Sequence, residues 1–274
     1  MKTIRRAFYA LFILIVLAFI FLFGVRFYLF NDDVDLIPSV IDQQKSQKVM
    51  AVFAHPDDES YITELLRDAQ NRSVLTALIT FTPGDAGEQQ PVVCQQQFLG
   101  DIRRAEVLKS GFALGVDYQH VLDYGDGTLA RQSLDELTAL VLAELKFFNP
   151  DLVVTFWPES GMTMHSDHMT IGKATQHAFR MYQKLPEGKN CYIAYPVMPP
   201  NLLEVMGKGE MNKLQPKANM AIYADAGAKI KLWNIHQSQK QFVKNFTGVP
   251  AWLLYRLANR EYYYLDETTE NNMP

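Results

Sequence analysis

Two short clusters of histidine and acidic residues stand out in this 274-residue sequence. The first, HPDDE at residues 55–59, directly follows a run of apolar and small residues. The second is HSDH at residues 165–168. Imidazole nitrogens and carboxylate oxygens are ligands that zinc prefers in proteins. Each cluster alone is a moderate indication of a metal site, and the two together are a much stronger one.

Both clusters also fit the first turn of a helix. Acidic residues such as Asp57 and Asp58 stabilise a helix N-terminus, and Ser166 or Asp167 could serve as an N-cap. A helix start does not explain His55 or its place directly after an apolar run. In the second cluster two histidines are three residues apart and share a helical face, which is a spacing suited to metal ligands.

The remaining histidines are weaker candidates. His177 lies nine residues after His168, which is about half a turn around a helix, so we expect it to point away from the site. His120 stands alone near a predicted strand and is interpreted as structural. His236 lies on a predicted amphipathic helix, and its pattern favours neither role.

Strands and helices are predicted to alternate along the chain. Apolar runs at 48–54, 73–82 and 151–157 predict strands, and the segments 134–148 and 169–183 have helical spacing. This alternation is typical of an α/β fold with a mainly parallel sheet covered by helices on both faces. Sites in such folds form where strands end and loops lead into helices, and both clusters lie at such points.

The segment from residue 48 to about 239 resembles the PIG-L/LmbE-like de-N-acetylases, zinc hydrolases that act on N-acetylglucosaminyl compounds. AHPDDE at 54–59 reproduces the signature of that family, and HSDH at 165–168 matches its H-x-D-H motif. Further counterparts, in the family's order, are the T-x-G-x-x-G loop at 82–87, the R-x-x-E helix with LGV at 103–116, Asp126-Gly127, and H-x-S-Q at 236–239. The resemblance implies a Rossmann-like domain.

The resemblance also implies a catalytic zinc site. His55, Asp58 and His168 would bind the ion and leave a fourth position for water. Zinc lowers the pKa of that water to about 7. Asp57 would be the general base that accepts its proton and later delivers it to the leaving amine.

Further roles follow from the same resemblance. His165 would donate to the oxyanion that develops on the amide, and Asp167 would orient a histidine and favour its charged form. We also expect Arg103 and His236 to contact the substrate. The segments 89–97 and 188–224 have no counterpart that we recognise in the family, so the resemblance does not imply a particular substrate.

The first 26 residues predict a membrane anchor. An uncharged run at 7–25 would span about 28 Å as a helix, which matches the hydrocarbon core of a bilayer. Basic residues precede this run and aspartates follow it, so the N-terminus should be cytoplasmic and the bulk of the chain outside, periplasmic or extracellular. A cleaved signal peptide is the alternative, but the run is long for one and no small-x-small cleavage site follows it.

We therefore expect an anchor at 1–26, a tether at 27–47 and one deacetylase domain at 48–274. The hydrophobic content of 48% describes a folded protein. The net charge is −4, and four of the 26 basic residues lie in or beside the anchor, so the outer domain has no general attraction for nucleic acid. Cys94 and Cys191 could form a bridge or remain free thiols.

The sequence thus predicts a metal-dependent amidohydrolase that removes the N-acetyl group from an N-acetylglucosamine-type sugar, in an envelope glycan, glycolipid or other glycoconjugate. A metallophosphoesterase acting on phosphosugars is one alternative, but two-metal sites usually need more ligands than this single dense set. A non-catalytic, metal-dependent glycan-binding protein is another, although binding alone would need no base at Asp57.

Overall fold

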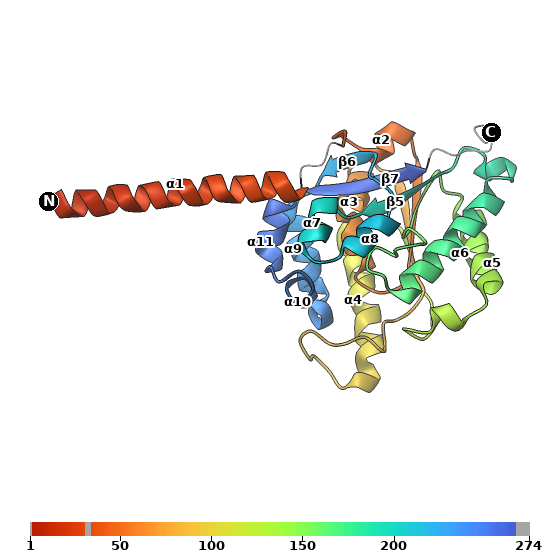
Figure 1. Ribbon diagram of the computed structural model, residues 1–274. Coiled ribbons are helices and arrows are strands. Elements are labelled where there is room, and N and C mark those ends of the chain that lie inside the picture. The colour runs from red at the N-terminus through yellow and green to blue at the C-terminus, as the bar shows by residue number, and fades with distance from the viewer. Residues whose placement is uncertain (1, 31–33, 267–274) are drawn as a thin grey trace.

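The computed structural model describes residues 2–30 and 34–266. In this part of the chain a seven-stranded sheet is flanked by helices, and one long helix, α1 (Lys2–Phe30), projects from the body (Figure 1). The predicted α/β fold with a mainly parallel sheet is confirmed.

The strand order in the sheet is β3-β2-β1-β4-β5-β7-β6. The five strands β1 to β5 pair in parallel, whereas β7 is antiparallel to both β5 and β6. The strands are β1 (Lys48–Phe53), β2 (Leu75–Thr80), β3 (Tyr118–Val121), β4 (Leu152–Val154), β5 (Tyr192–Val197), β6 (Met220–Tyr223) and β7 (Arg260–Asp266).

The helices that follow α1 fall into a longer and a shorter group. The longer ones are α3 (Thr63–Asn71), α4 (Leu99–Leu114), α5 (Leu134–Phe148), α6 (Ser166–Tyr182) and α9 (Ala226–Ile235). The shorter ones are α2 (Val40–Gln44), α7 (Pro200–Val205), α8 (Gly209–Leu214), α10 (Phe242–Thr247) and α11 (Ala251–Leu257).

Strand β1 lies in the middle of the sheet and is buried on both faces. Val49, Ala51 and Phe53 pack into the core beneath α3, whereas Met50 and Val52 pack on the opposite face with α5 and α6. Alternate residues of a strand point to opposite faces, so a strand covered on both sides must be apolar at every position. This is why the segment before the first polar cluster is a continuous apolar run.

Several predicted boundaries shift in the structure, and the predicted strand 73–82 shortens to β2. The predicted strand 151–157 shortens to β4, because the chain leaves the sheet after Thr155, shortly before a proline that cannot continue a ladder. The predicted helix 169–183 begins three residues earlier, since the His165 side chain accepts a hydrogen bond from the backbone N–H of Asp167 and caps α6. The predicted helix 134–148 coincides with α5.

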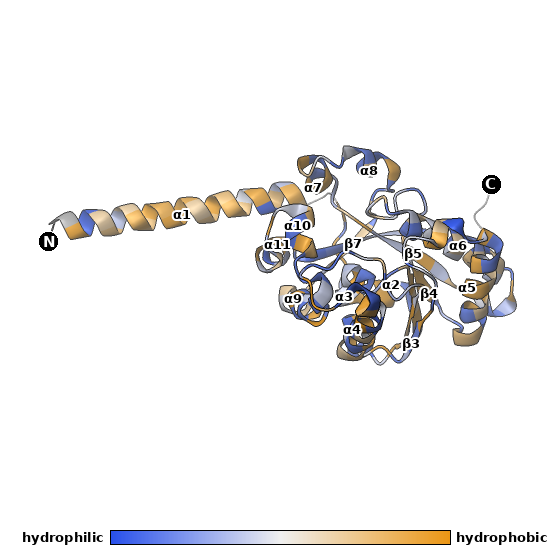
Figure 2. Cartoon of the chain, turned by 90° about the horizontal axis from the view of Figure 1, so that it is seen from below, coloured by the Kyte–Doolittle hydropathy of each residue, from blue (hydrophilic) through white to orange (hydrophobic). Residues whose placement is uncertain are grey.

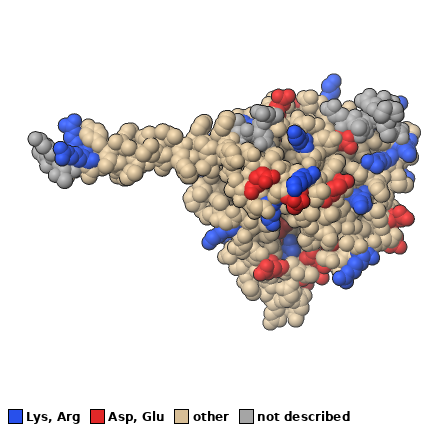
Figure 3. Space-filling model, in the orientation of Figure 1, with Lys and Arg blue, Asp and Glu red and all other residues tan. Residues whose placement is uncertain are grey.

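Helix α1 contains an 18-residue window with a mean hydropathy of 2.9, and this window is not buried against the rest of the chain. Figure 2 shows that most of its residues are hydrophobic. On the face seen in Figure 3, charged side chains lie near its free end and on the domain, but not between them. The helix is long and apolar enough to cross a membrane. A signal sequence has the same features, so α1 is a membrane anchor or a signal sequence.

Part of the predicted tether is structured. Leu36 forms a bridge with Ala221 beside β6, and α2 follows at Val40–Gln44. Val40 and Ile41 are buried in the core cluster beneath α3. Part of the segment that was predicted to be a tether therefore packs against the domain.

Candidate metal and catalytic site

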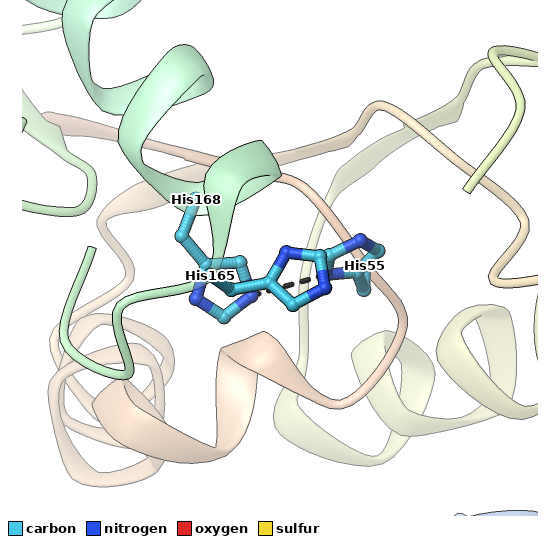
Figure 4. Close-up of side chains that lie close together, drawn as sticks. All are labelled: His55, His165 and His168. Carbon is cyan, nitrogen blue, oxygen red and sulfur yellow. Dashed lines mark hydrogen bonds between the residues drawn. The ribbon is translucent and has the colours of Figure 1, made fainter. Parts of the chain in front are cut away.

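Both polar clusters lie at the same edge of the sheet. The segment 55–59 follows β1, and the loop 155–165 follows β4, which pairs with β1 in parallel. The carboxyl ends of neighbouring parallel strands meet at one edge, so the two loops come together there. Figure 4 shows that His55 from the first loop lies beside His165 and His168 at the start of α6.

His55, Asp58 and His168 form a tight, buried triangle. His55 Nδ1 lies 3.0 Å from His168 Nε2. Asp58 Oδ1 lies 3.2 Å from His168 Nε2, and Asp58 Oδ2 lies 3.8 Å from His55 Nδ1. Two atoms bound about 2.0–2.1 Å from a tetrahedral zinc ion would lie about 3.3 Å apart. The three side chains therefore have the spacing and the chemistry of a zinc ligand set.

The ring of His168 is held by contacts on its far side. Its Nδ1 lies 2.8 Å from the carbonyl oxygen of Gly161 and 3.0 Å from Oγ1 of Thr163. The ring also stacks on Phe156, with the ring centroids 4.2 Å apart. A histidine that donates its Nδ1–H to a carbonyl carries a free lone pair on Nε2. That atom is the one that faces His55.

His55 is oriented by two carboxylates. Its Nε2 lies 2.9 Å from Asp126 Oδ1 and 3.3 Å from Asp167 Oδ2. Burial alone would lower the pKa of His55, but the hydrogen bonds to Asp126 and Asp167 and the charge of Asp58 outweigh it and raise the pKa to about 10. Carboxylates behind a metal-binding histidine fix its ring and increase its basicity. A divalent cation bound at Nδ1 would take the place of a proton.

His165 offers a second choice of third ligand. One of its ring nitrogens lies within 4.8 Å of ligand atoms of His55 and His168. His165 is exposed, however, and its Nδ1 accepts the N-cap hydrogen bond of α6. Asp58 is buried, and its Oδ2 accepts hydrogen bonds from two backbone N–H groups of its own turn. A carboxylate fixed in this way needs less rearrangement, so the geometry favours Asp58.

Asp57 has an unusual backbone conformation beside this triangle. Its φ of 91° is one that residues other than glycine rarely adopt, and such conformations occur often at functional sites. Its N–H donates to Glu59 Oε2 over 3.0 Å, and its Oδ2 accepts from Arg103 Nη2 over 3.3 Å. Burial raises the pKa of Asp57 to about 6, although the charge of Arg103 opposes this rise. A carboxylate with a pKa near neutrality is suited to proton transfer.

Asp167 ties three segments together. Besides His55, it accepts hydrogen bonds from the backbone N–H groups of Gly127 at 2.7 Å and Leu129 at 3.1 Å. Burial alone would raise the pKa of Asp167, but the hydrogen bond with His55 and the backbone donor lower it. The carboxylate therefore stays ionised behind His55, where the prediction placed it behind a histidine.

Arg103 is buried and supports the loops. Its Nη2 donates to the carbonyl oxygen of Pro56 over 2.8 Å, and its Nη1 donates to that of Gly84 over 3.0 Å. Gly84 has a φ of 72°, and a Cβ there would collide with the guanidinium of Arg103. The arginine also lines the metal cavity. Its Nη2 holds Pro56 and Asp57, its Nη1 holds Gly84, and its Nε has no hydrogen-bond partner in the described part of the chain.

His236 does not reach the site's surface. It is fully buried, and its Nε2 lies 2.5 Å from Glu59 Oε1, a carboxylate that also accepts from Ser110. The other oxygen of Glu59 holds the N–H of Asp57. Direct contact of His236 with a substrate, which the sequence analysis predicted, is therefore not supported by this arrangement. The pair of His236 and Glu59 instead supports the turn that carries Asp57.

A cavity of about 1050 Å³, partly open to solvent, joins these groups. His55, Asp57, Asp58, His165 and His168 all line it. A small polar substrate could thus reach the proposed ligands and the neighbouring carboxylate together.

Asp126 also lines this cavity, although it was absent from the predicted site residues. It had been noted only as part of a motif shared with the family. His177 is exposed on α6, and His120 pairs with Glu144, so neither belongs to the site.

Comparisons with known proteins agree with this geometry. The family model PIG-L, GlcNAc-PI de-N-acetylase, matches residues 50–179, which include both polar clusters. A protein named "Probable N-acetyl-alpha-D-glucosaminyl L-malate deacetylase 2", from Bacillus anthracis, is 26% identical over 217 residues, covering 77% of this chain and 93% of the relative. The chain belongs to the PIG-L/LmbE-like de-N-acetylase family.

Solved structures share the fold of this PIG-L/LmbE-like chain. A zinc-inhibited form of the teicoplanin deacetylase Orf2 aligns with a TM-score of 0.54 at 16% identity, covering 81% of this chain and 99% of the other. The 4-carboxy-2-hydroxymuconate hydratase GalB from Pseudomonas putida KT2440 aligns with a TM-score of 0.60 at 13% identity, covering 80% and 95%. A hydratase and a deacetylase thus share one fold, so the fold alone does not decide the reaction.

The family membership decides the reaction class. The PIG-L/LmbE-like chain is a hydrolase of carbon–nitrogen bonds and a de-N-acetylase of that family. The metal-dependent character of the family agrees with the groups of histidine and aspartate that could hold a metal ion.

The elements after residue 179 lie beyond the matched segment of this PIG-L/LmbE-like chain. They include the segment 188–224, which the sequence analysis could not relate to the family and which forms β5, α7, α8 and β6. The Gln-rich segment 89–97 is joined to the C-terminal part, because Gln90 exchanges backbone hydrogen bonds with Ser238 and Gln241. Cys94 and Cys191 are both free thiols.

Proposed function

We propose that this protein is a zinc-dependent N-deacetylase that hydrolyses the acetamide of an N-acetylglucosamine-type sugar at the outer surface of a membrane. The proposal is carried by one observation. Three ligand-type side chains from two separate loops lie within 3.8 Å of one another, with the carboxylate of Asp57 beside them in the same cavity.

His55, Asp58 and His168 would hold the ion in this proposal. The donor set fits zinc, because it consists of two imidazoles and one carboxylate and leaves one side open toward the cavity. Zinc bound there would acidify a water molecule to a pKa of about 7 and polarise the amide carbonyl. The ligand rings are held in place by Asp126, Asp167 and Gly161, which limits the rearrangement needed on binding.

Asp57 is the proposed general base. Its raised pKa of about 6 lets it accept a proton from water near neutral pH and return that proton to the leaving amine. Arg103 holds the carboxylate by a 3.3 Å contact, and Glu59 holds the backbone N–H of the same residue. These two contacts hold the side chain and the backbone of Asp57 in place.

His165 is the proposed donor to the oxyanion that develops on the amide carbonyl. Its Nδ1 accepts the N–H of Asp167, so in the neutral ring the proton lies on Nε2. Burial and the neighbouring His55 and His168 lower the pKa of His165, which favours this neutral form. A neutral N–H donor at the mouth of the cavity suits oxyanion stabilisation.

The cellular location of the enzyme is part of the same proposal. We infer that α1 stays in the membrane as a single-pass anchor, with the N-terminus cytoplasmic and the domain on the periplasmic or extracellular side. Basic residues before the apolar run and aspartates after it support this orientation. An enzyme held there would meet an envelope glycan, a glycolipid or another glycoconjugate.

The test is an assay for newly formed primary amines over a panel of N-acetylated sugars. Full-length protein is purified in detergent, stripped with a chelator and reloaded with zinc. We expect acetate and free amine in equal amounts from at least one N-acetylglucosamine derivative, loss of this activity with chelator and recovery with zinc. Turnover that is unaffected by complete metal removal would reject the zinc mechanism, and release of phosphate from phosphosugars would favour the phosphoesterase alternative.

A further inference from the structure

A second cavity lies where α1 meets the C-terminal helices. Its empty volume is about 820 Å³, part of it open to solvent. Most of the residues that surround it are apolar. They come from the end of α1, from β5, α7, α9, α10, α11 and β7, and from loops between these elements. They include Phe30, Leu202, Met206, Val243, Phe246 and Leu254.

This apolar cavity adjoins the metal cavity. Tyr61, Trp233, Phe242 and Phe246 line both of them. A molecule whose polar end lies at the proposed metal ligands can therefore extend past these aromatic rings into the apolar cavity. The two cavities have the arrangement required for one amphipathic ligand.

The apolar cavity is also next to the membrane-spanning helix. Phe30 is the last residue of α1, and α7, α10 and α11 gather around this end of the helix in both ribbon views (Figures 1 and 2). Arg26 donates to Asn259 Oδ1 over 2.7 Å, and Asn201 donates to the carbonyl oxygen of Tyr28 over 2.7 Å. These contacts fasten the end of the helix to the domain.

The length of α1 places this end near the lipid headgroups. The uncharged run at 7–25 spans about 28 Å as a helix, which nearly fills a hydrocarbon core of about 30 Å, and Arg26 follows it directly. The last turns of α1 therefore emerge at the membrane surface. Trp252 on α11 and Tyr28 are both exposed near this junction, and such aromatic rings are enriched at the headgroup level.

Two of the three charged residues that line the apolar cavity form an ion pair with each other, and the third is Arg260. Lys229 Nζ lies 2.7 Å from Glu261 Oε1 and donates to the carbonyl oxygen of Ser60 over 3.0 Å. Glu261 also accepts from the hydroxyl of Tyr263 over 2.6 Å. Both side chains of the ion pair are almost fully buried. This part of the wall offers no unpaired charge, so an apolar ligand suits the cavity better than an ionic one.

We propose that this apolar cavity binds the hydrocarbon chain of a lipid-linked, N-acetylated amino sugar while the sugar lies at the metal site. The inference rests on the proposed function and specifies its substrate class. Because the enzyme removes acetyl, the long chain is attached away from the amide, and we place it at the aglycone end of the sugar. The walls from α7, α10 and α11 lie beyond residues 50–179, the segment that the family model matches.

The experiment compares octyl and methyl glycosides of N-acetylglucosamine, below the micellar concentration, with zinc-loaded full-length protein in lipid nanodiscs. Each fully buried methylene contributes up to about fourfold in binding. We expect kcat/KM to be at least about 100-fold higher for the octyl glycoside. Partition of the octyl compound into the bilayer contributes to this ratio equally for all variants, so the variants decide the question.

Two variants of α7 form the matched pair. Leu202 lines the apolar cavity, whereas Val205, on the same helix, is 63% exposed and outside it. Leu202→Asp should lower the octyl-to-methyl ratio at least about tenfold, because a carboxylate is costly to leave beside a bound hydrocarbon chain. Val205→Asp should leave the ratio within about twofold. Leu202→Trp fills the space without adding charge and should lower the octyl-to-methyl ratio as Leu202→Asp does. In every variant, turnover of the methyl glycoside shows whether the protein is folded.

A binding measurement separates this inference from the proposed function. An octyl glucoside with a terminal bromine has no acetamide, and it should quench the fluorescence of Trp233 in the native protein but not in Leu202→Trp or Leu202→Asp. Trp233→Phe identifies that signal. Equal octyl-to-methyl ratios of kcat/KM in Leu202→Asp and Val205→Asp, together with unchanged quenching, would show that the apolar cavity does not bind the hydrocarbon chain. This holds even if the methyl glycoside is deacetylated. If quenching depends on Leu202 but no deacetylation occurs, the apolar cavity would still be a site for a hydrocarbon chain, and the proposed reaction would be rejected.

Discussion

At the scale of single residues, each proposed ligand is held by a different kind of partner. Asp126 and Asp167 hold His55, the Gly161 carbonyl holds His168, and backbone N–H groups hold Asp58. These partners restrict the ligand side chains without occupying the atoms that face one another. Pre-oriented ligands lower the cost of ordering the site when an ion binds.

The first prediction separates Asp58 from His165 as the third ligand. Asp58→Ala, like His55→Ala or His168→Ala, should weaken zinc binding by more than about 100-fold, since even the loss of a supporting partner costs about 10- to 100-fold. His165→Ala should keep about one zinc per chain, measured by competition with a chromophoric chelator. Full zinc affinity in Asp58→Ala together with its loss in His165→Ala would assign the third ligand to the histidine instead.

The second prediction concerns the base. Asp57→Asn keeps the size of the side chain and removes its ability to accept a proton. It should retain zinc and thermal stability while kcat falls by about 10²–10⁴-fold. The control is His165→Ala, for which we expect a loss of about 10²–10³-fold with the metal retained. Near-normal turnover of Asp57→Asn on the best N-acetyl sugar would exclude this residue as the base.

At the scale of elements, the site depends on how closely α6 approaches the loop after β4. Gly172 on α6 packs against the backbone of Phe156, and a Cβ at this glycine would overlap the carbonyl oxygen of that residue. The same helix carries His168 in its first turn, and Phe156 stacks on that histidine. A small displacement of α6 would therefore move a proposed ligand.

The third prediction tests this close packing. Gly172→Ala should destabilise the domain by about 1–3 kcal/mol, as overpacking in a rigid core does, and should also weaken zinc binding. Lys173→Ala on the exposed side of the same helix is the control and should change neither quantity appreciably. Denaturant unfolding and zinc titration measure the two effects. A Gly172→Ala protein with unchanged stability would show that α6 can shift without cost.

At the scale of the whole molecule, the apolar helix and the catalytic domain are joined at one end of the domain. Hydrogen bonds from Arg26 and Asn201 fasten the last turns of α1 to the body. These contacts place the end of α1, which would cross the membrane, beside the apolar cavity. Such an enzyme would be directed toward substrates presented at the membrane surface.

The fourth prediction concerns orientation. We expect full-length protein to stay in the membrane fraction at its uncleaved size, with the domain outside the cytoplasm. Alkaline phosphatase fused after residue 274 should be active, and a fluorescent protein that matures only in the cytosol should be dark. The reverse pattern would place the domain inside the cell and make a cytosolic lipid-linked sugar the better substrate class. A shortened soluble product would instead identify α1 as a cleaved signal.

The sequence by itself determined the ligand-type residues, the alternation of strands and helices, and the apolar N-terminal segment. These features are local. The cluster at 55–59 directly follows one strand-forming segment, and the cluster at 165–168 follows another after a short loop. Parallel pairing brings the ends of neighbouring strands together in any fold of this class. Burial on both faces also makes a central strand a continuous apolar run, which can be recognised without knowing its partners.

Only the tertiary structure decided which distant side chains meet. The pairing of His236 with Glu59 joins residues 177 positions apart, and it turned a predicted substrate contact into a buried support. Asp126 behind His55 and the cavity around Leu202 have the same origin. Contacts of this kind depend on how helices and loops from separate parts of the chain pack in space. Local periodicity carries no information about that packing, because it records only which face of each element is apolar.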